Sequence, residues 1–368
     1  MNDVDKCTQL IILGNGLDLS CNLKSSYNDF YIQRFSSEIV EYFKDTSQYI
    51  GTPPKDSKNY GFIELILLAR LEGKDKEIYW RTIEDEIAEL INERYAYHPK
   101  KIARKLYQTS VTKEIRVERV VKCLEERAKK RTLSTSDNYA NLMEEFKKSI
   151  SQLEKEFKKY LIQNVEQSYF YGANIRKMYN YLTEEKKDET YVLNFNYTNN
   201  DRKLFYEYVN VHGALSNDEN IIFGIDESIV KDDYNLYDIT KTYRKIQLDS
   251  KLNNQSKSFP KEIKKIKFYG HSLGEADYAY FQSIFDYFQI YDSNVQIIFY
   301  YYNYDPSSDL LSRQTNSIVK LLKDYSNSFS GNLEKKGKNL LHKLCLEGRL
   351  QIKELTIEYD EEKIVDIR

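Results

Sequence analysis

The run Gln9–Leu13 (QLIIL), followed at once by Gly14-Asn15-Gly16, decides the fold that we expect for this chain. A short and nearly continuous apolar run that ends in glycine is typical of a buried parallel strand. Apolar and aromatic residues then recur near helical spacing over 17–43, with an interruption around 24–26. The chain therefore begins with a strand, a glycine-rich turn and helical segments.

The rest of the chain divides into a helical part and a part with strands. Helical patterns dominate first, at 62–71, 80–97 and 138–163. Strand-like runs return after residue 185, at 190–195, 209–211, 221–223, 266–269 and 295–302. Helical patterns fall between and after them, at 276–287 and 315–324. Strands that alternate with helices predict a parallel sheet with crossover connections.

We therefore predict an α/β fold with a Rossmann-like parallel sheet and a mostly helical insertion. The sheet domain takes 1–45 and 185–368, and the insertion takes 46–184. Lys-rich stretches at 100–105 and 125–131 interleave with acidic residues, so we interpret them as solvated helix faces.

The composition excludes several classes of protein. The 368 residues carry 55 Lys+Arg against 57 Asp+Glu, so no positive charge favours nucleic acid or anionic lipid. The 17 Phe and 33 Tyr supply enough buriable surface to argue against disorder. Four scattered cysteines without a CxxC pair predict neither a disulfide framework nor a zinc site. Without a signal peptide or a membrane-span pattern, the chain is expected to be cytoplasmic.

The turn Gly14-Asn15-Gly16 is the first candidate site. Backbone amides in a glycine-rich turn bind phosphate oxygens, and two glycines at this spacing let the backbone approach a pyrophosphate. Leu19 stands where the dinucleotide fingerprint has its third glycine, so a tight structural turn explains the pair as well. The charge of Asp18 would repel phosphate, and this side chain suits a hydroxyl or ribose contact, or an N-cap, better.

Two further candidates follow predicted strands. Asn196 and Thr198 come after the run at 191–193, and His212 follows 209–211. Residues beyond the carboxyl ends of parallel strands line the ligand crevice of α/β proteins. Asn196 with Thr198 can hold a sugar hydroxyl or a water, and a neutral His212 can act as a general base. Asx-type turn chemistry and a structural histidine explain the same residues without a ligand.

The segment Gly270–Gly274 matches the Gly-x-Ser-x-Gly nucleophile elbow of α/β-hydrolases, with Ser272 as the nucleophile. Asp305 and His342 would complete a triad in the chain order of that fold. Against this hypothesis, His342 falls in a helical pattern at 340–350, large polar residues follow the elbow, and no oxyanion-hole loop stands out upstream. A serine hydrolase stays an alternative.

Taken together, these segments resemble the AbiH family of bacterial abortive-infection proteins, which act against phage. The opening carries the Asn-Gly-x-Asp-Leu pattern at 15–19, followed by a Leu-x-Ser-Ser-Tyr-x-x-Phe run at 23–30. The remaining landmarks are Trp80 with Ile83-Glu84, Phe195–Thr198, Val211–Gly213, Ile222–Asp226 and Gly270–Gly274. The resemblance spans nearly the whole chain and is thinner from about 100 to 185.

The same order of motifs is similar to the sirtuin (SIR2-like) fold, which implies an NAD+ site. In this resemblance Asn196 holds ribose and water, His212 is the base, and Asp18 contacts the ribose or stabilises an oxocarbenium-like state. The spacing between Asn196 and His212 is compatible with a helix at 200–208. The nucleotide-binding residues that the resemblance implies are Gly14, Asn15, Gly16, Tyr27, Thr198, Gly270, His271, Ser272 and Asp277.

Departures from the sirtuin pattern leave the chemistry open. The paired cysteines of the sirtuin zinc ribbon are missing, and Thr198 stands where an Asp is usual. We expect NAD+ as a substrate, cleaved at its nicotinamide–ribose bond without a metal. The alternative is a nucleotide-sensing module whose helical insertion contacts a phage or host partner. A phage-derived trigger and a homo-oligomer are left open, and neither membrane nor nucleic acid is expected as a partner.

Overall fold

The computed structural model describes 6–45, 47, 49–69, 83–84, 87–88, 111–128, 138–198, 202–216, 219–230, 234–252, 258–303, 309–331 and 334–355. The chain divides into two compact units. The first takes Met1–Ser25, Ile162–Glu219 and Leu248–Arg368, and the second takes Ser26–Leu161 and Asn220–Gln247. The predicted division differs in three segments: 26–45 and 220–247 belong to the second unit, whereas 162–184 belongs to the first. Trp80 and Asp305 lie outside the described residues.

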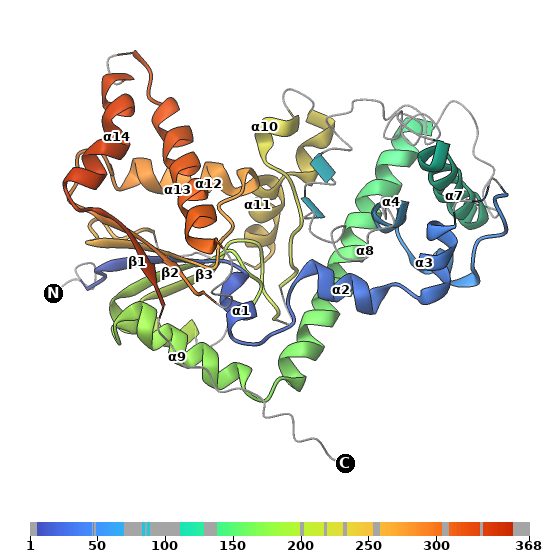
Figure 1. Ribbon diagram of the computed structural model, residues 1–368, viewed down its shortest axis with the longest axis horizontal. Helices are drawn as coiled ribbons and strands as arrows, with labels where there is room; N and C mark the ends of the chain where they lie inside the picture. Colours follow the sequence, from blue (N-terminus) through green and yellow to red (C-terminus); the bar gives the residue numbers. More distant parts are fainter. Residues whose placement is uncertain are drawn as a thin grey trace. The chain divides into compact units, whose positions relative to one another are not determined.

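The first unit contains a six-stranded parallel sheet with the order β3-β2-β1-β4-β5-β6 (Figure 1). At its centre, Ile11 pairs with Val192 on one side and with Lys267 on the other. From β1 the chain adds β2 and β3 on one side of the sheet and then β4, β5 and β6 on the other side. The direction in which strands are added therefore reverses between β1 and β4. This is the switch point of Rossmann-type sheets, and it confirms the predicted α/β, Rossmann-like fold. The strands are β1 Gln9–Leu13, β2 Thr190–Asn194, β3 Glu207–Asn210, β4 Lys265–Tyr269, β5 Gln296–Tyr301 and β6 Leu350–Glu354.

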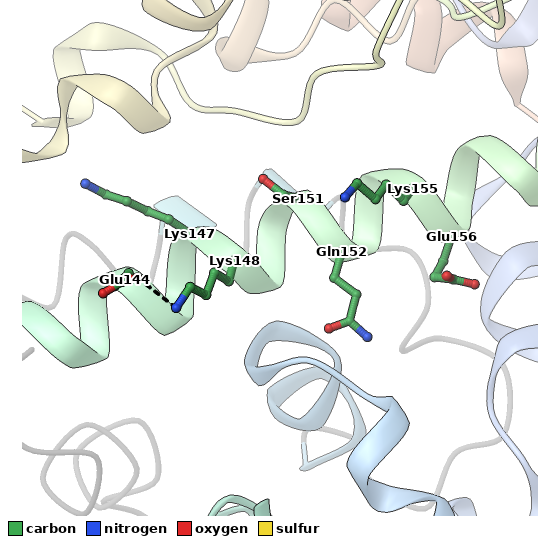
Figure 2. Close-up of a pocket in the computed structure, with 7 residues that line it drawn as sticks. All are labelled: Glu144, Lys147, Lys148, Ser151, Gln152, Lys155 and Glu156. Carbon is green, nitrogen blue, oxygen red and sulfur yellow. Dashed lines mark ion pairs between the residues drawn. The ribbon is translucent and has the colours of Figure 1, made fainter. Parts of the chain in front are cut away.

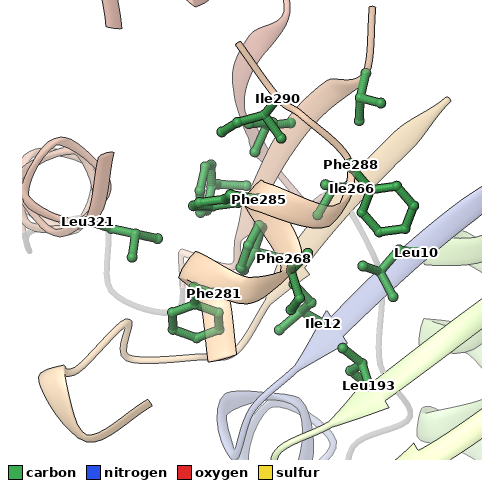
Figure 3. Packing of buried hydrophobic residues seen from close by; sticks show 14 of the residues in the cluster. Leu10, Ile12, Leu193, Ile266, Phe268, Phe281, Phe285, Phe288, Ile290 and Leu321 are labelled. Atoms are coloured by element: carbon green, nitrogen blue, oxygen red, sulfur yellow. The ribbon is translucent and has the colours of Figure 1, made fainter. Parts of the chain in front are cut away.

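Helices cover both faces of this sheet. Side chains point alternately to its two faces along each strand, and in β1 the side chains on both faces are apolar and buried. Leu10 and Ile12 of β1 join an apolar cluster with Phe281, Phe285 and Leu321 (Figure 3). On the other face, Ile11 and Leu13 of β1 join a second apolar cluster with Met178 and Leu182 of α9. The helices of this unit are α1 Gly16–Ser20, α9 Tyr171–Thr183, α12 Tyr278–Tyr287, α13 Leu310–Asn327 and α14 Glu334–Leu346, with short 3-10 turns η4 Lys187–Glu189, η5 Arg202–Leu204 and η7 Glu275–Asp277.

The second unit is mostly helical. Serines cap two of its helices: the Ser26 hydroxyl accepts from the Asp29 N–H and the Ser36 hydroxyl from the Ile39 N–H. Inside it, Arg244 donates to the buried Glu154 at 2.8 Å. Its elements are α2 Tyr27–Arg34, α3 Ser37–Lys44, η2 Lys55–Asn59, α4 Phe62–Ala69, α7 Val111–Ala128, α10 Glu227–Val230 and η6 Tyr234–Ile239, together with most of α8 Asn138–Gln167 and of α11 Lys241–Leu252.

Three expectations about secondary structure are wrong. The run 221–223 is no strand: the Phe223 N–H donates to the Glu154 carboxylate at 2.7 Å instead of to a neighbouring strand. The predicted helix at 200–208 is reduced to η5, because β3 already begins at Glu207. The helical pattern at 340–350 ends at Leu346, and the next strand, β6, was missed, since its half-exposed edge position lacks an apolar run.

Within the described residues, no helix is long and apolar enough to cross a membrane.

Candidate functional site

Three glycines bring two turns into backbone contact at the switch point of the sheet. The Gly16 N–H donates to the Gly270 carbonyl at 2.7 Å, and the Gly14 N–H donates to the Tyr269 carbonyl at 3.0 Å. A Cβ on Gly14 would lie 2.5 Å from Cα of His271, and one on Gly16 would lie 2.6 Å from Cα of Gly270. The turns after β1 and β4 therefore fit together only because these positions lack side chains.

This packing gives the Gly-x-Gly pair a structural reason that is independent of a ligand. Gly270 itself adopts a φ of +70°, and a Cβ there would lie 2.4 Å from the backbone nitrogen of Leu17. A pyrophosphate contact of the two glycines stays a prediction. Asn15, between them, fixes the following loop, because its side chain accepts from the Ser25 hydroxyl at 2.6 Å and donates to the Ser25 carbonyl at 3.2 Å.

Asp18 lies in α1, directly after the first of these turns, and is completely buried. Its carboxylate accepts hydrogen bonds from the hydroxyls of Tyr171 at 2.7 Å and Thr198 at 3.1 Å, and from the amide of Asn196. Burial raises the pKa of Asp18 to about 6, although the three donors act in the opposite direction. Asp18 therefore positions protein groups, and its contact with a ribose stays a prediction.

Asn196 and Thr198 lie in a loop after β2 that is fixed by asparagines. Asn194 and Asn210 pair at the ends of β2 and β3. The Asn194 amide donates to the Thr198 carbonyl at 2.6 Å, and the Asn210 amide donates to the carbonyls of Asn196 and Thr198, both at 3.0 Å. The Asn196 side chain is also held at both ends, by Asp18 and by the Tyr197 N–H.

The sequence analysis missed Tyr171, Asn194 and Asn210. Two asparagines that end neighbouring strands were a usable signal, whereas nothing in the sequence links Tyr171 to Asp18, which is 153 residues earlier. Asn210 Oδ1 is a buried acceptor without a hydrogen-bond partner among the described residues. A water or a ligand hydroxyl would satisfy it.

The second cluster of the site joins His212, His271 and Asp277. Asp277, in η7, has one carboxylate oxygen 3.0 Å from Nε2 of His212 and the other 3.4 Å from Nε2 of His271. The two imidazoles are 4% and 5% exposed, and the Asp277 side chain is 15% exposed, so Asp277 marks the solvent side of the cluster.

Aromatic rings surround these histidines. Phe195 lies edge-to-face against both imidazoles, with ring centroids 5.5 Å from His212 and 4.9 Å from His271. Tyr280 and Phe281 of α12 contact one histidine each. The apolar packing fixes the positions of both rings and restricts the access of water to them.

The described geometry around Ser272 does not match a nucleophile elbow. Ser272 is exposed, and the left-handed backbone falls on Gly270 and on Leu273, with a φ of +57°. A 3-10 turn separates Ser272 from α12, whereas an elbow places its serine directly between strand and helix. His342 is exposed on α14.

The first unit thus brings together most of the predicted site residues, at the carboxyl ends of β1, β2, β3 and β4. Tyr27 belongs to the second unit, where its ring centroid lies 5.0 Å from that of Phe157 and 5.8 Å from that of Phe223, and its contact with a nucleotide stays a prediction. The described residues contain no group of three or more His, Cys, Asp or Glu that could hold a metal ion.

A separate surface hollow of about 400 Å³ follows one face of α8 in the second unit (Figure 2). Lys148 pairs there with Glu144 at 2.7 Å, one helical turn away. Since all its lining side chains are polar or charged and come from one helix, we interpret it as a solvated helix face. They are Glu144, Lys147, Lys148, Ser151, Gln152, Lys155 and Glu156.

Comparison with known proteins gives one family. A family model described as "Bacteriophage abortive infection AbiH" matches residues 10–302, a range that contains every residue of both clusters. No curated protein and no solved structure matches the chain.

Proposed function

Since this match covers most of the chain, the chain belongs to the AbiH family of bacteriophage abortive infection proteins, and we propose that it binds and hydrolyses NAD+ or a closely related nucleotide. The site would lie at the carboxyl edge of the sheet. Loss of NAD+ from an infected cell would stop phage growth, which fits abortive infection.

The observation that carries this proposal is the strand order. The order β3-β2-β1-β4-β5-β6 reverses between β1 and β4, and α/β proteins of this topology bind nucleotides at that crevice. The turns of Gly14 and Gly270 lie at the reversal, and His212 with its partner Asp277 lies at the same edge. The unsatisfied Asn210 Oδ1 supplies a buried acceptor that suits a ribose hydroxyl or a water.

The proposed step forms one bond and breaks one. A water oxygen bonds to the anomeric carbon of the ribose, and the carbon–nitrogen bond breaks with its electron pair going to nicotinamide. His212 takes the proton that the water loses, and the products are nicotinamide and ADP-ribose. Asp277 lies 3.0 Å from Nε2 of His212 and orients the imidazole. Asp18 acts on this step through Asn196.

A second candidate is a module that binds the nucleotide without cleaving it. Both ends of the Asn196 side chain are bound to protein groups, to Asp18 and to the Tyr197 N–H. An asparagine held in this way has little capacity to orient an attacking water. This observation favours nucleotide sensing, with the second unit as the part that contacts a phage or host protein.

The test measures nicotinamide and ADP-ribose by chromatography after incubation of purified protein with NAD+, with and without phage lysate. We expect His212→Ala to reduce turnover by at least about 100-fold, because a general base contributes 10²–10⁴ in rate. His342→Ala is the matched control, since His342 is exposed on α14. Full turnover by His212→Ala would remove the assigned base.

If the wild-type protein releases no nicotinamide under either condition, the hydrolase proposal fails. Binding of NAD+ measured by calorimetry would then decide for the sensing module. Absence of binding would remove the nucleotide site altogether.

A further inference from the structure

The turn after β4 is closed by one of its own side chains. The Leu273 N–H donates to Nδ1 of His271, two residues earlier, at 2.9 Å. Asn and Asp side chains make the same contact with the backbone two residues on in Asx turns. In the part of the chain that the structure describes, no backbone group of 271–273 bonds to another backbone group. The imidazole therefore supplies the hydrogen bond that closes this turn.

The turn has an unfavourable backbone conformation that this hydrogen bond offsets. Leu273 has a φ of +57°, in the left-handed region that disfavours residues other than glycine. Its side chain packs against the apolar cluster of β4 and α12, and this packing does not depend on pH. The ion pair that follows, between Glu275 and Lys320 at 2.6 Å, is exposed and contributes little. The contact with His271 is therefore the part of the turn that can respond to pH.

Only a neutral imidazole makes this contact. Nδ1 accepts a hydrogen bond through its lone pair, whereas both nitrogens of an imidazolium carry a proton. Protonation of His271 would place a second N–H against the Leu273 N–H, with no acceptor between them. Histidine ordinarily changes its charge between pH 5 and 8, so this event falls within a range in which folded proteins are commonly stable.

A carboxylate lies beside the other ring nitrogen of His271. One oxygen of Asp277, in η7, is 3.4 Å from Nε2 of His271, and its other oxygen is 3.0 Å from Nε2 of His212. The loop after β2 and the helix α12 face His271 with the aromatic rings of Phe195 and Phe281. Asp277 is thus an ion-pair partner for the protonated form, and His212 is the second titratable group at the same carboxylate.

We propose that His271 is a pH-sensitive switch for the turn at 270–274. In its neutral form it accepts from the Leu273 N–H and keeps the turn closed. In its protonated form, with the proton taken from solvent, it releases the Leu273 N–H and pairs with Asp277, and the turn opens. The turn contacts the first glycine turn through the Gly270 carbonyl and the Gly16 N–H, so its release changes the edge of the candidate site.

Two substitutions of His271 separate the closed turn from the open one. His271→Asn keeps a side-chain acceptor two residues before Leu273 and cannot be protonated, so we expect the turn to stay closed at every pH. His271→Phe keeps a ring against Phe195 and Phe281 but removes the acceptor, so we expect the turn to be open at every pH. His342→Asn is the matched control: His342 is exposed on α14, and this variant should respond to pH as the wild type does.

The measurement is the exchange of the Leu273 amide proton with solvent, followed by NMR of protein labelled with ¹⁵N-leucine between pH 5 and 8. Division by the intrinsic rate of an unprotected amide at each pH leaves the protection that the fold provides. In the wild type we expect this protection to fall at least about tenfold from pH 8 to pH 5, with the same midpoint as the titration of the His271 imidazole signals. In His271→Asn it should not change with pH.

Protection that stays constant while His271 titrates would overturn the proposal, and so would a His271 that stays neutral down to pH 5. An equal fall in His271→Asn and in the wild type would assign the response to another group and would also overturn it. These outcomes do not involve NAD+.

One consequence rests on the proposed function: NAD+ binding, measured by calorimetry, should weaken toward pH 5 in the wild type and not in His271→Asn. Absence of NAD+ binding at every pH would contradict the proposed function, whereas the exchange of the Leu273 amide would still decide whether His271 is a switch.

Discussion

At the scale of single residues, Asp18 links the stability of the fold to pH. It is completely buried, and burial raises its pKa from 3.8 to about 6. A neutral carboxyl is tolerated there because the hydroxyls of Tyr171 and Thr198 can reverse and accept a hydrogen bond. The folded protein therefore binds the Asp18 proton more tightly than the unfolded chain does.

This difference predicts how the free energy of unfolding depends on pH. Asp18 is protonated in both states below about pH 4, and only in the folded state between about pH 4 and 6. The free energy of unfolding therefore falls as the pH rises through this window. Asp18 alone accounts for a fall of about 3 kcal/mol, and above about pH 6 it causes no further change. Urea unfolding of wild type and Asp18→Asn at several pH values measures it.

In that comparison the asparagine variant lacks the titration, and groups away from Asp18 contribute equally to both proteins. The amide of the variant can accept from Asn196 with its oxygen and donate to the two hydroxyls with its nitrogen, so the substitution contributes a term that does not change with pH. We expect the free energy of unfolding of the wild type to fall relative to that of the variant as the pH rises from 4 to 7. Parallel curves for the two proteins would show that Asp18 has an ordinary pKa.

At the scale of elements, the contact between the turns after β1 and β4 is decided by glycine. We predict that Gly270→Ala costs at least about 3 kcal/mol, because a Cβ would lie 2.4 Å from the Leu17 nitrogen and the φ is +70°. Gly348→Ala separates backbone strain from steric overlap, because Gly348 has a φ of +63° but a Cβ there would have no atom within 4 Å. We expect about 1 kcal/mol there.

Gly274→Ala is the neutral reference in the same loop. Its Cβ would lie 3.5 Å from the Ser272 hydroxyl, and its backbone is extended. Denaturation midpoints of the three variants should fall in the order Gly274, Gly348, Gly270, from least to most destabilised. If Gly270→Ala were no worse than Gly348→Ala, the close approach of the two turns would be wrong.

The elements also show how far sequence patterns reach. The strand at 9–13 was predicted with its observed ends, because a continuous apolar run followed by glycine is a local signal. The run at 221–223 looks the same in sequence, yet its Phe223 N–H is taken by the Glu154 carboxylate, 69 residues earlier. Such a competing partner leaves no trace in the local pattern.

At the scale of the whole molecule, stability should fall from the centre of the sheet to its edges. All residues of β1 are buried and β1 is paired on both sides, whereas β6 is an edge strand with half-exposed residues. We predict that amides of β1 and β4 exchange with deuterium at least about tenfold more slowly than those of β6. Mass spectrometry of peptides after exchange measures it, and equal protection of β1 and β6 would contradict it.

The sequence by itself determined the α/β class, the glycine turn after the first strand, the family, and the positions of Asn196 and His212 after their strands. These follow from short-range periodicity and from motifs that are contiguous in the chain. Only the tertiary structure decided the strand order, the unit to which Tyr27 belongs, the fit of Gly270 against Gly16, and the sharing of Asp277 by two histidines. Those features join segments tens to hundreds of residues apart, where pairing is decided by packing in space and not by local residue preference.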